Sequence, residues 1–519
     1  MTDFSVTAAR RGRDRKAVML PAIPGRTRAG RAAPRCAVVG AGIAGIAAAT
    51  LLAERGIRVT LYEREGTLGG RLAGWPLQLA DGSGVTMSRG FHAFFRQYYN
   101  LRGLLRRVDP ALERLRRLPD YPLRHSSGLY DSFARVPRTP PWSALGFAAL
   151  SPSFGWRDMR RLDARAALPL LDVRLPQLYE HYDGISAHEL LERIRFPEAA
   201  RHLAFEVFSR SFFADPRDLS AAELALMFHI YFLGSSEGLL FDVPDEPYPQ
   251  ALWDPLARYL ESHRADILTG TAVEAVEPSA HGGLTLVTTA GTHHADAVVL
   301  ALDTTGLRSL AARSPHLCDG TWRAGISRLH VAPPFLVSRI WLDRPVASHR
   351  PGFLGTSGYG PLDNISVLNR WEGEAARWSQ KTGGCVIELH AYAVDPSADR
   401  ERLAEDLIEQ LHRVYPETRS ARVVDQHHLW RADCPLFAVG SHRDRPTVAT
   451  PDPRVTVAGD LVRTDLPVAL MERAATTGFL AANAHLRRWG LRGQTLWTVP
   501  AHGRSALLRS LARVAEKFR

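Results

Sequence analysis

Three glycines and one glutamate near the N-terminus have the spacing of a diphosphate-binding turn. Gly40, Gly42 and Gly45 follow the apolar run 37–39, and Glu63 lies further along the chain. In such a turn the first glycine permits a tight bend, the second lets a pyrophosphate approach the backbone, and the third lets a helix pack on a strand. The helix would offer N–H groups to the diphosphate, and the carboxylate would accept hydrogen bonds from a ribose. The pattern predicts a dinucleotide site.

A second glycine pair follows Glu63. Gly69 and Gly70 precede Arg71, so the chain can fold back over the same diphosphate while the guanidinium donates to its oxygens. The sequence from Glu63 through Arg64 to Arg71 resembles the pattern of the flavoprotein superfamily that contains amine oxidases and carotenoid desaturases. This resemblance implies a buried, extended FAD, with Arg64 among its contacts. The alternative from the residues alone is a surface turn.

A matching motif lies in the C-terminal part of the chain. The apolar run 455–458 ends in Gly459 and Asp460, and a helical pattern begins near Met471. Asp460 can bond a ribityl or diphosphate-proximal hydroxyl, and the positive end of the helix would stabilise an anionic reduced flavin. The superfamily usually has glycine at the position of Arg473, which leaves the local backbone shape open.

The segment 88–100 is dense in aromatic residues and glycine, and we expect it to enter the active site. It contains GFHAFFRQYYN, which resembles a segment of plant- and cyanobacterial-type phytoene and zeta-carotene desaturases that passes close to the flavin ring. We predict Arg89, Phe91 and His92 as catalytic residues. His92 is either a proton acceptor or a core histidine with satisfied hydrogen bonds. The ring faces from Phe91 to Tyr99 would stabilise a cation.

Large apolar residues recur at helical spacing between 205 and 232. They are Phe205, Phe208, Phe212, Phe213, Leu224, Met227, Phe228, Tyr231 and Phe232. This spacing is typical of core packing, and it also fits an apolar tunnel for a long apolar substrate. The stretch resembles the corresponding region of actinobacterial isorenieratene synthases, and that resemblance favours the tunnel.

The order of the motifs predicts an α/β protein with a discontinuous cofactor domain. We expect a Rossmann-like FAD-binding domain of the glutathione-reductase type from residues 34–95, 245–310 and 450–490. An interleaved α+β substrate domain would comprise residues 96–244 and 311–449. The superfamily resemblance places a backbone pair against the adenine, and we assign this contact to Val273.

The two chain ends are basic. Residues 1–33 are predicted to form an extended arm, and residues 491–519 an amphipathic tail. Its apolar face would consist of Leu507, Leu511, Val514 and Phe518. Such a helix can lie in a lipid headgroup layer or dock onto the protein's own core. A carotenoid dissolved in lipid favours the membrane surface, and we predict a cytoplasmic protein bound peripherally to the cytoplasmic membrane.

Composition argues against several classes of protein. The 519 residues carry a net charge of +11, but no helix-turn-helix, zinc-finger or RNP motif accompanies it, so we do not expect nucleic acid as a partner. Four scattered cysteines argue against a disulfide framework and favour a reducing compartment. The adjacent His427 and His428 would point to opposite faces of a strand, so no metal site is predicted. No apolar run reaches the length of about 18 residues that spans a membrane.

The resemblance to isorenieratene synthases implies a reaction. These enzymes convert the beta-ionone rings of beta-carotene into trimethylphenyl rings, which removes hydrogens and shifts one methyl group. We hypothesise hydride abstraction by flavin, a methyl shift and proton loss, with His92 as the candidate base and Glu237 and Asp242 as weaker ones. The alternatives are an acyclic carotene desaturase or isomerase, and a non-redox FAD-dependent isomerase or cyclase. The intact glycine motif disfavours a carotenoid-binding scaffold. The electron acceptor, a quinone or oxygen, stays open.

Overall fold

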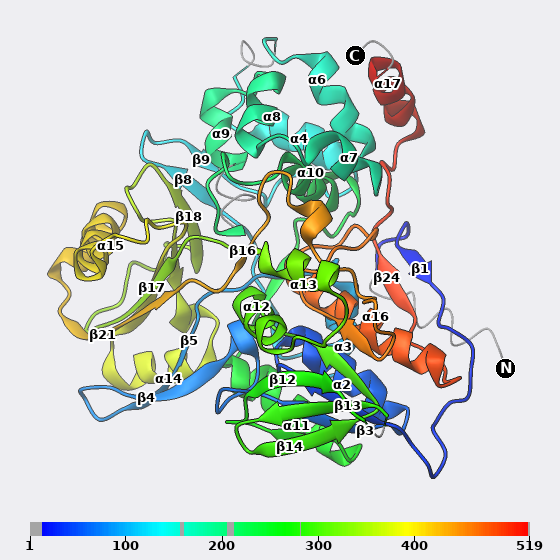
Figure 1. Ribbon diagram of the computed structural model, residues 1–519. Helices are drawn as coiled ribbons and strands as arrows, with labels where there is room; N and C mark the ends of the chain where they lie inside the picture. The colour runs from blue at the N-terminus through cyan, green and yellow to red at the C-terminus, as the bar shows by residue number, and fades with distance from the viewer. Residues whose placement is uncertain (1–12, 156–159, 205–211, 281, 517–519) are drawn as a thin grey trace.

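The computed structural model describes residues 13–155, 160–204, 212–280 and 282–516 (Figure 1). Its cofactor domain is built on a five-stranded sheet of order β11-β3-β2-β15-β23, in which every pairing is parallel. The strands are β2 Arg35–Val39, β3 Arg58–Tyr62, β11 Asp266–Leu268, β15 Ala297–Leu300 and β23 Val455–Val457. The apolar central strands are almost completely buried, because both faces of the sheet are covered. The sheet thus joins three separate parts of the chain, as predicted.

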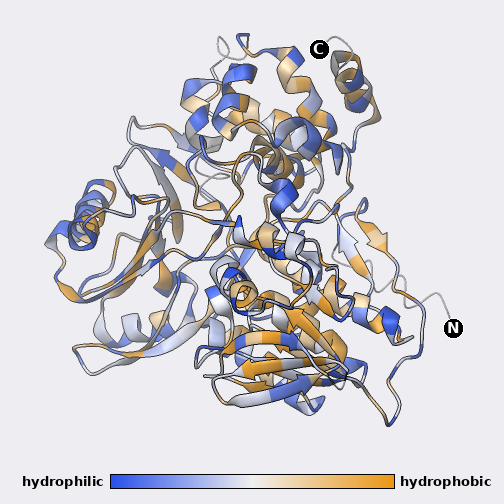
Figure 2. Cartoon of the chain, in the orientation of Figure 1, coloured by the Kyte–Doolittle hydropathy of each residue, from blue (hydrophilic) through white to orange (hydrophobic). Residues whose placement is uncertain are grey.

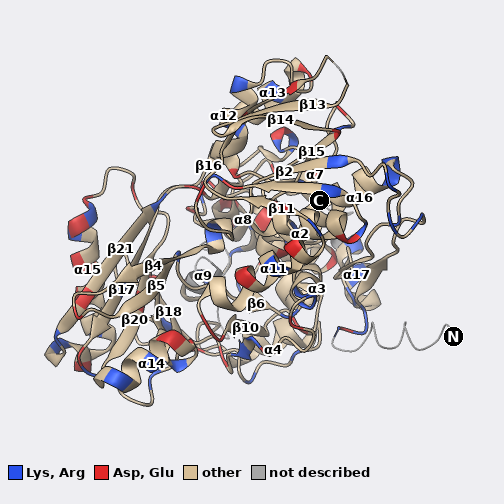
Figure 3. Ribbon diagram, turned by 90° about the horizontal axis from the view of Figure 1, so that it is seen from below, with Lys and Arg blue, Asp and Glu red and all other residues tan. Residues whose placement is uncertain are grey.

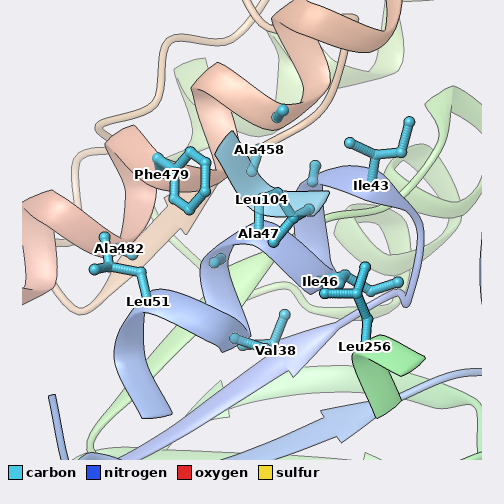
Figure 4. Packing of buried hydrophobic residues seen from close by; sticks show 14 of the residues in the cluster. Val38, Ile43, Ile46, Ala47, Leu51, Leu104, Leu256, Ala458, Phe479 and Ala482 are labelled. Atoms are coloured by element: carbon cyan, nitrogen blue, oxygen red, sulfur yellow. The ribbon is translucent and has the colours of Figure 1, made fainter. Parts of the chain in front are cut away.

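Helices cover one face of this sheet. They are α2 Ile43–Glu54, α3 Tyr99–Leu105, α11 Asp254–Ser262 and α16 Leu470–Arg488. Figure 4 shows how Val38 of β2 and Ile46 of α2 meet Leu104, Leu256 and Phe479 from the other three helices in one apolar cluster. The cluster holds the glycine-rich turn between β2 and α2 against the rest of the domain.

A small antiparallel sheet and two helices cover the other face. The sheet is formed by β12 Val273–Pro278, β13 Leu284–Thr288 and β14 Gly291–Ala295, and the helices are α12 Thr304–Arg313 and α13 Gly320–Ser327. Leu286, Leu310 and Ile326 share one buried cluster with Val298 of β15 and Val455 of β23. The cofactor domain therefore has two apolar layers, one on each face of its sheet.

The substrate domain is organised around a seven-stranded sheet of order β21-β17-β20-β19-β18-β8-β9. Its strands are β8 Leu123–His125, β9 Tyr130–Asp131, β17 Phe335–Leu342, β18 Phe353–Ser357, β19 Asn364–Val367, β20 Cys385–Ala391 and β21 Val423–Arg431. All pairings are antiparallel except that of β18 with β8. The helix α15 Arg400–Val414 packs Leu407 and Leu411 on one face. The helix α14 Gly373–Thr382 packs Trp378 near Trp341.

A helical region forms the top of the molecule in Figure 1. It contains α4 Trp142–Leu150, α6 Ala164–Ala167, α7 Gln177–Tyr182, α8 Ala187–Ile194, α9 Glu198–Ala204 and α10 Ala221–Phe228. The last of these continues into the π-helical turn η5 His229–Leu233. Figure 2 shows hydrophobic and hydrophilic residues alternating around these helices, which turn their apolar sides toward a shared core. Phe205 and Phe208 lie outside the described residues.

Three short strands connect the helical region to both domains. They form a sheet of order β6-β10-β7, with β6 Phe94–Phe95, β7 Leu115–Arg117 and β10 Phe241–Pro244. A further antiparallel pair is formed by β16 His330–Val331 and β22 Pro435–Leu436. These strands lie in the two segments that lead into and out of the main part of the substrate domain.

The packing differs from the predicted domain boundaries in three places. The helix α3, assigned to the substrate domain, packs in the apolar cluster of α2. The helices α12 and α13 extend the cofactor domain beyond residue 310. The hairpin of β4 Gly74–Gln78 and β5 Gly84–Ser88, assigned to the cofactor domain, instead packs Val85 near Trp341. Apolar contact, and not position along the chain, decides which domain each segment joins.

The described parts of both chain ends pack onto the protein. The strand β1 Val18–Leu20 pairs with β24 Leu496–Thr498, and Asp14, only 8% exposed, forms an ion pair with Arg504 at 2.8 Å. The predicted arm is therefore extended but not free, and the predicted tail begins inside the core. Acidic and basic residues are interspersed on surface helices such as α15 (Figure 3). Among the described residues, no helix has both the length and the hydrophobicity to cross a bilayer.

Candidate functional site

One continuous cavity of about 1050 Å³ runs from the glycine-rich turn into the substrate domain. The predicted residues that line it are Gly40, Gly42, Glu63, Arg64, Gly69, Gly70, Arg71, Arg89, Phe91, His92, Val273, Gly459, Asp460 and Met471. Gly45 lies behind this lining, in the first turn of α2. The structure thus brings both predicted motifs and the aromatic segment to the same cavity. Their direct contacts with a cofactor stay predictions.

The turn between β2 and α2 requires glycine for reasons of space. A Cβ atom on Gly45 would lie 1.8 Å from the Gly40 carbonyl oxygen. Gly40 itself has φ +102°, and a Cβ there would lie 2.4 Å from the Ala301 carbonyl oxygen. Gly70 has φ +57°, and its Cβ would lie 3.2 Å from the Gly42 Cα. The chain therefore forms a shallow backbone cradle that an extended diphosphate fits.

Two helices direct their N-terminal turns into this end of the cavity. The helix α2 begins after Gly42 and α16 after Ala469, and neither start is capped by a side chain. The first N–H groups of a helix have no partner within the helix and carry partial positive charge. Ile43, Ala44 and Met471 from these first turns line the cavity. Both starts are suited to receive anionic groups, a diphosphate at α2 and a reduced flavin ring at α16.

Backbone donors fix the position of the Glu63 carboxylate. Its Oε2 accepts a hydrogen bond from the Ala41 N–H at 2.8 Å, and its Oε1 accepts one from the Glu65 N–H at 3.0 Å. A carboxylate oxygen can accept further hydrogen bonds, so the group can still receive ribose hydroxyls. Arg64, by contrast, extends outward with its side chain 67% exposed, and pairs with Glu65.

Arg71 and Asp460 form an ion pair at 2.5 Å. Burial would lower the pKa of Arg71, but the adjacent Asp460 carboxylate outweighs burial and raises that pKa. The two residues were predicted from motifs at opposite ends of the chain, each as a separate contact to the cofactor. Their pairing holds the N-terminal and C-terminal motifs together at the wall of the cavity.

Arg473 shapes the backbone where the superfamily usually has glycine. Its side chain is 1% exposed and forms an ion pair with Glu223 of α10 at 2.9 Å. It also donates hydrogen bonds to the carbonyl oxygens of Val468 at 3.0 Å and Asp460 at 3.3 Å. The preceding Leu470 has φ +51°. Arg473 therefore fixes the loop between Asp460 and α16, which settles the question that the sequence left open. Sequence reasoning missed Glu223, since nothing local marks it as a partner.

The aromatic segment after β5 places the candidate catalytic residues. His92 Nδ1 is 2.9 Å from the Gly90 carbonyl oxygen, which also accepts a hydrogen bond from the Tyr248 hydroxyl at 2.7 Å. Burial lowers the pKa of His92 to about 4, so the ring is neutral and its Nδ1 carries the hydrogen. Arg89 forms an ion pair with Asp433. Its charge is therefore compensated within the protein.

Aromatic side chains form the substrate end of the cavity. They are Phe91, Phe95, Tyr98, Tyr121, Phe133, Phe212, Phe213, Tyr231, Phe241, Phe335, Phe353, Tyr392 and Phe437. Phe91 stacks on Phe353 with ring centroids 4.3 Å apart. Of the residues predicted for a tunnel, Phe212, Phe213 and Tyr231 line this wall. The other described residues of this set do not line the cavity. They pack in or against the core of the helical region, and they are Leu224, Met227, Phe228 and Phe232.

Polar residues on β20 and β19 also reach this wall, and sequence reasoning missed them. Asn364, His390 and Tyr392 line the cavity. A signal was present, because Glu388, His390 and Tyr392 alternate along an apolar strand, and alternate residues share one face of a sheet. Glu237 and Asp242, the weaker candidates for the base, are not among the lining residues. Glu237 bonds the Tyr99 hydroxyl, and Asp242 pairs with Arg96 and Arg102.

Comparisons with known proteins agree with this geometry. The family model "Flavin containing amine oxidoreductase" matches residues 43–486. The carotenoid phi-ring synthase of Streptomyces griseus is 72% identical over 98% of both chains. An enzyme of the same name from Chlorobaculum tepidum is 27% identical over 90% of this chain and 91% of its own. The sequence resemblance to isorenieratene synthases therefore agrees with these comparisons in the kind of enzyme, although the relatives carry a different name.

A solved structure supports the fold alone. Cyclohexylamine oxidase from Brevibacterium oxydans superimposes with a TM-score of 0.63 at 16% identity, over 88% of this chain and all of the other. The family match and the cradle of glycines agree on FAD as the cofactor. The chain belongs to the family of flavin containing amine oxidoreductases and is an FAD-dependent oxidoreductase.

Proposed function

We propose that this enzyme converts the beta-ionone rings of beta-carotene into trimethylphenyl rings, giving isorenieratene. The observation that carries the proposal is the single cavity that joins the glycine cradle to a wall of aromatic side chains. Identity of 72% to a carotenoid phi-ring synthase supports a reaction that forms a carotenoid end ring. Zeta-carotene desaturases, such as that of Synechocystis at 24% identity, are more distant relatives.

The residues of the cavity suit a long apolar polyene. Burial of aromatic and aliphatic surface provides affinity without directional bonds, and apolar side chains displace water from around a bound ring. Phe91, Phe241 and Phe353 pack together at this wall, and their faces can stabilise a cationic ring. FAD, when bound, supplies the two-electron acceptor that takes hydride from the ring.

Formation of an aromatic ring requires a methyl shift in addition to oxidation. When a ring that has lost a hydride carries its positive charge on the carbon next to the quaternary carbon, one methyl group can migrate from the quaternary carbon to that cationic carbon. Loss of a proton then gives a double bond, and a second oxidation completes the aromatic ring. An acyclic desaturase shares the cofactor site but forms no such cation at a ring, and a non-redox isomerase transfers no net electrons.

The test is conversion in bacteria that accumulate beta-carotene. We expect a product with unchanged carbon count, fewer hydrogens and aromatic methyl signals in the extracted pigment. Untouched beta-carotene, with conversion of phytoene or lycopene instead, would assign the acyclic reaction. Gly70→Val is the matched control, because a side chain at φ +57° and 3.2 Å from Gly42 closes the cradle. This variant should leave beta-carotene unchanged.

Delivery of beta-carotene from a bilayer is part of the proposal. The helix α17 Ala506–Glu516 buries Ala512 and exposes Leu507, Leu511 and Val514 by 70%, 44% and 54%. These three side chains therefore do not dock on the protein's own core, and Phe518 lies outside the described residues. We assign this face to an anionic lipid surface on the cytoplasmic side of the membrane, because the helix is basic and the substrate is soluble in lipid.

Sedimentation with vesicles tests the membrane contact. The holoenzyme should co-sediment with vesicles containing phosphatidylglycerol, and the double variant Leu507→Gln, Leu511→Gln should stay in the supernatant with its FAD content unchanged. The matched control is Val287→Gln, which alters another side chain that is 40% exposed, on β13 of the cofactor domain. Equal sedimentation of both variants would overturn the assignment.

A further inference from the structure

A buried relay of polar side chains ends at the wall of the cavity. The strand β20 and the residue after it present Glu388, His390 and Tyr392 on one face of the sheet. His390 Nε2 is 2.9 Å from Glu388 Oε1, and the Tyr392 hydroxyl is 2.7 Å from His390 Nδ1. Glu388 and His390 are 0% and 1% exposed. The relay thus leads from the interior of the sheet to the cavity.

The hydrogen-bond donors in this relay follow from the charge on Glu388. Burial would raise the pKa of Glu388, but the positive charge of Arg339 and the hydrogen bond to His390 outweigh it and lower the pKa to about 2. An ionised carboxylate only accepts hydrogen bonds, so His390 Nε2 must carry a hydrogen. In neutral His390 the Nδ1 atom is then an acceptor, and the Tyr392 hydroxyl donates to it.

Other contacts hold the relay in place. Arg339 donates to Glu388 Oε2 at 3.0 and 2.8 Å, and to the Thr86 carbonyl oxygen at 2.7 Å. The Asn364 side-chain amide donates to the Tyr392 hydroxyl at 3.0 Å. A Cβ on Gly90 would lie 2.4 Å from the His390 ring. The imidazole is therefore fixed between the sheet and the segment that carries His92.

We propose that Tyr392 and His390 accept the ring protons in the reaction proposed above, on which this inference rests. FAD, when bound, would supply the hydride acceptor, and loss of a hydride would leave the ring as a cation. The electron pair of a neighbouring C–H bond becomes the new double bond, and its proton passes to the Tyr392 oxygen. The hydroxyl proton of Tyr392 moves to His390 Nδ1. Each ring would lose two hydrides and two protons in two such rounds. In each round the quinone or oxygen that reoxidises the flavin would take up the hydride electrons and the proton released from His390, so that the relay is restored before the second round.

The chemistry of the ring explains why a neutral pair suffices. A carbocation is a strong acid, so its proton needs a correctly placed acceptor and not a strong base. The carboxylate of Glu388 stabilises the imidazolium that forms on His390, as in other aligned carboxylate–histidine pairs. Among the described residues His92 has no carboxylate partner, and burial lowers its pKa to about 4. His390 is the better placed acceptor.

The experiment separates hydride transfer from proton loss. Purified holoenzyme with beta-carotene in vesicles is followed in two parallel samples. Flavin bleaching without oxygen or quinone reports the first hydride transfer, and chromatography of samples supplied with a quinone measures the aromatic product. The variants are Tyr392→Phe and His390→Gln. The matched control is Tyr415→Phe, which removes a buried hydroxyl without a hydrogen-bond partner among the described residues, in the apolar layer under α15.

We expect Tyr392→Phe and His390→Gln to lower aromatic product formation by about 10²-fold or more, while flavin bleaching changes less than about threefold. A solvent deuterium isotope effect on product formation, present in the unaltered enzyme, should be lost in Tyr392→Phe. FAD content and thermal unfolding should match the Tyr415→Phe control.

Two results would overturn the inference. Product formation in Tyr392→Phe at the rate of the control would show that the hydroxyl takes no proton. A parallel loss of bleaching and product would show that the relay only shapes the cavity. Absence of aromatic product from the unaltered enzyme is a different outcome, because it removes the proposed reaction itself.

Discussion

The two ends of the cavity differ in whether main chain or side chains shape them. The cofactor end is shaped mainly by backbone. At Gly40 and Gly45 the Cβ position is filled by another main-chain atom, and two helices begin there without side-chain caps. The substrate end consists of side chains, with aromatic rings from separate strands and helices and a buried relay behind them. The glycine turn that would bind the cofactor tolerates little change in residue type, but it is formed by one continuous segment. The side chains that would bind the substrate come from segments spread over the whole chain.

Ion networks connect these two ends to the core in different ways. At the cofactor end, Glu223 of the helical region binds Arg473 and Arg445 and so fixes the loop beside Asp460. At the substrate end, Arg339 binds Glu388 and supports His390. The first network positions backbone and the second positions a side chain. Variants in each network should therefore separate the loss of cofactor from the loss of chemistry.

The largest effect is expected from Arg473→Met, which leaves the buried Glu223 with Arg445 as its remaining ion-pair partner. The free energy of unfolding should fall by about 3–5 kcal/mol, and FAD should be lost with it. Urea denaturation and flavin absorbance measure both. Arg413→Met, in a pair with Glu409 whose side chains are both more than half exposed, should cost less than about 1 kcal/mol. Equal losses in both variants would contradict the role assigned to Arg473.

Acid should destabilise the substrate end through Glu388. Its pKa is about 2 in the folded chain and about 4.3 in the unfolded chain. A lowered pKa gives stability that is present above the unfolded value and is lost as pH falls toward 2. The contribution is about 3 kcal/mol. In Glu388→Gln, urea denaturation between pH 2 and 5 should give a shallower slope than in the unaltered protein, whereas Glu409→Gln should keep the full slope.

Gly45→Ala should disturb the cofactor end specifically. The added Cβ would lie 1.8 Å from the Gly40 carbonyl oxygen, so α2 must move away from β2. We expect a loss of about 1–3 kcal/mol in the free energy of unfolding and weaker FAD binding, measured by flavin fluorescence titration. Gly84→Ala is the control, since nothing lies within 4 Å of its Cβ position. Unchanged FAD affinity in Gly45→Ala would show that the cradle tolerates a shift of the helix.

The smallest effect is expected from Arg64→Ala. Its side chain is 67% exposed and pairs with the exposed Glu65, so the loss of FAD affinity should stay below about 1 kcal/mol. Titration with FAD measures it against Arg71→Ala, which breaks the pair with Asp460 and should weaken binding more. A larger effect from Arg64 would show that its exposed side chain contacts the cofactor directly.

Sequence reasoning identified the elements whose contacts are local. The strand, turn, helix and second strand from β2 to β3 form one continuous segment, and their glycine spacing follows from backbone geometry alone. The motif at Gly459 and Asp460 was found for the same reason.

The domain boundaries and the partners of charged residues were not predictable in this way. The residues around Arg71 do not indicate Asp460 as its ion-pair partner, and those around Arg473 do not indicate Glu223. Each pair joins segments hundreds of residues apart. The helical spacing of aromatic residues around Tyr231 likewise could not separate the cavity wall from the helical core. Which side of a helix meets a cavity depends on what packs against the other side.

The sequence by itself determined that a dinucleotide cradle exists, because its glycines act through their own backbone. The tertiary structure decided which side chains complete the site. The relay of Glu388, His390 and Tyr392 is visible in the sequence only as an alternation along one strand. It becomes a path for protons because the neighbouring strand supplies Arg339, and because the fold places that face of the sheet against the same cavity as the cradle.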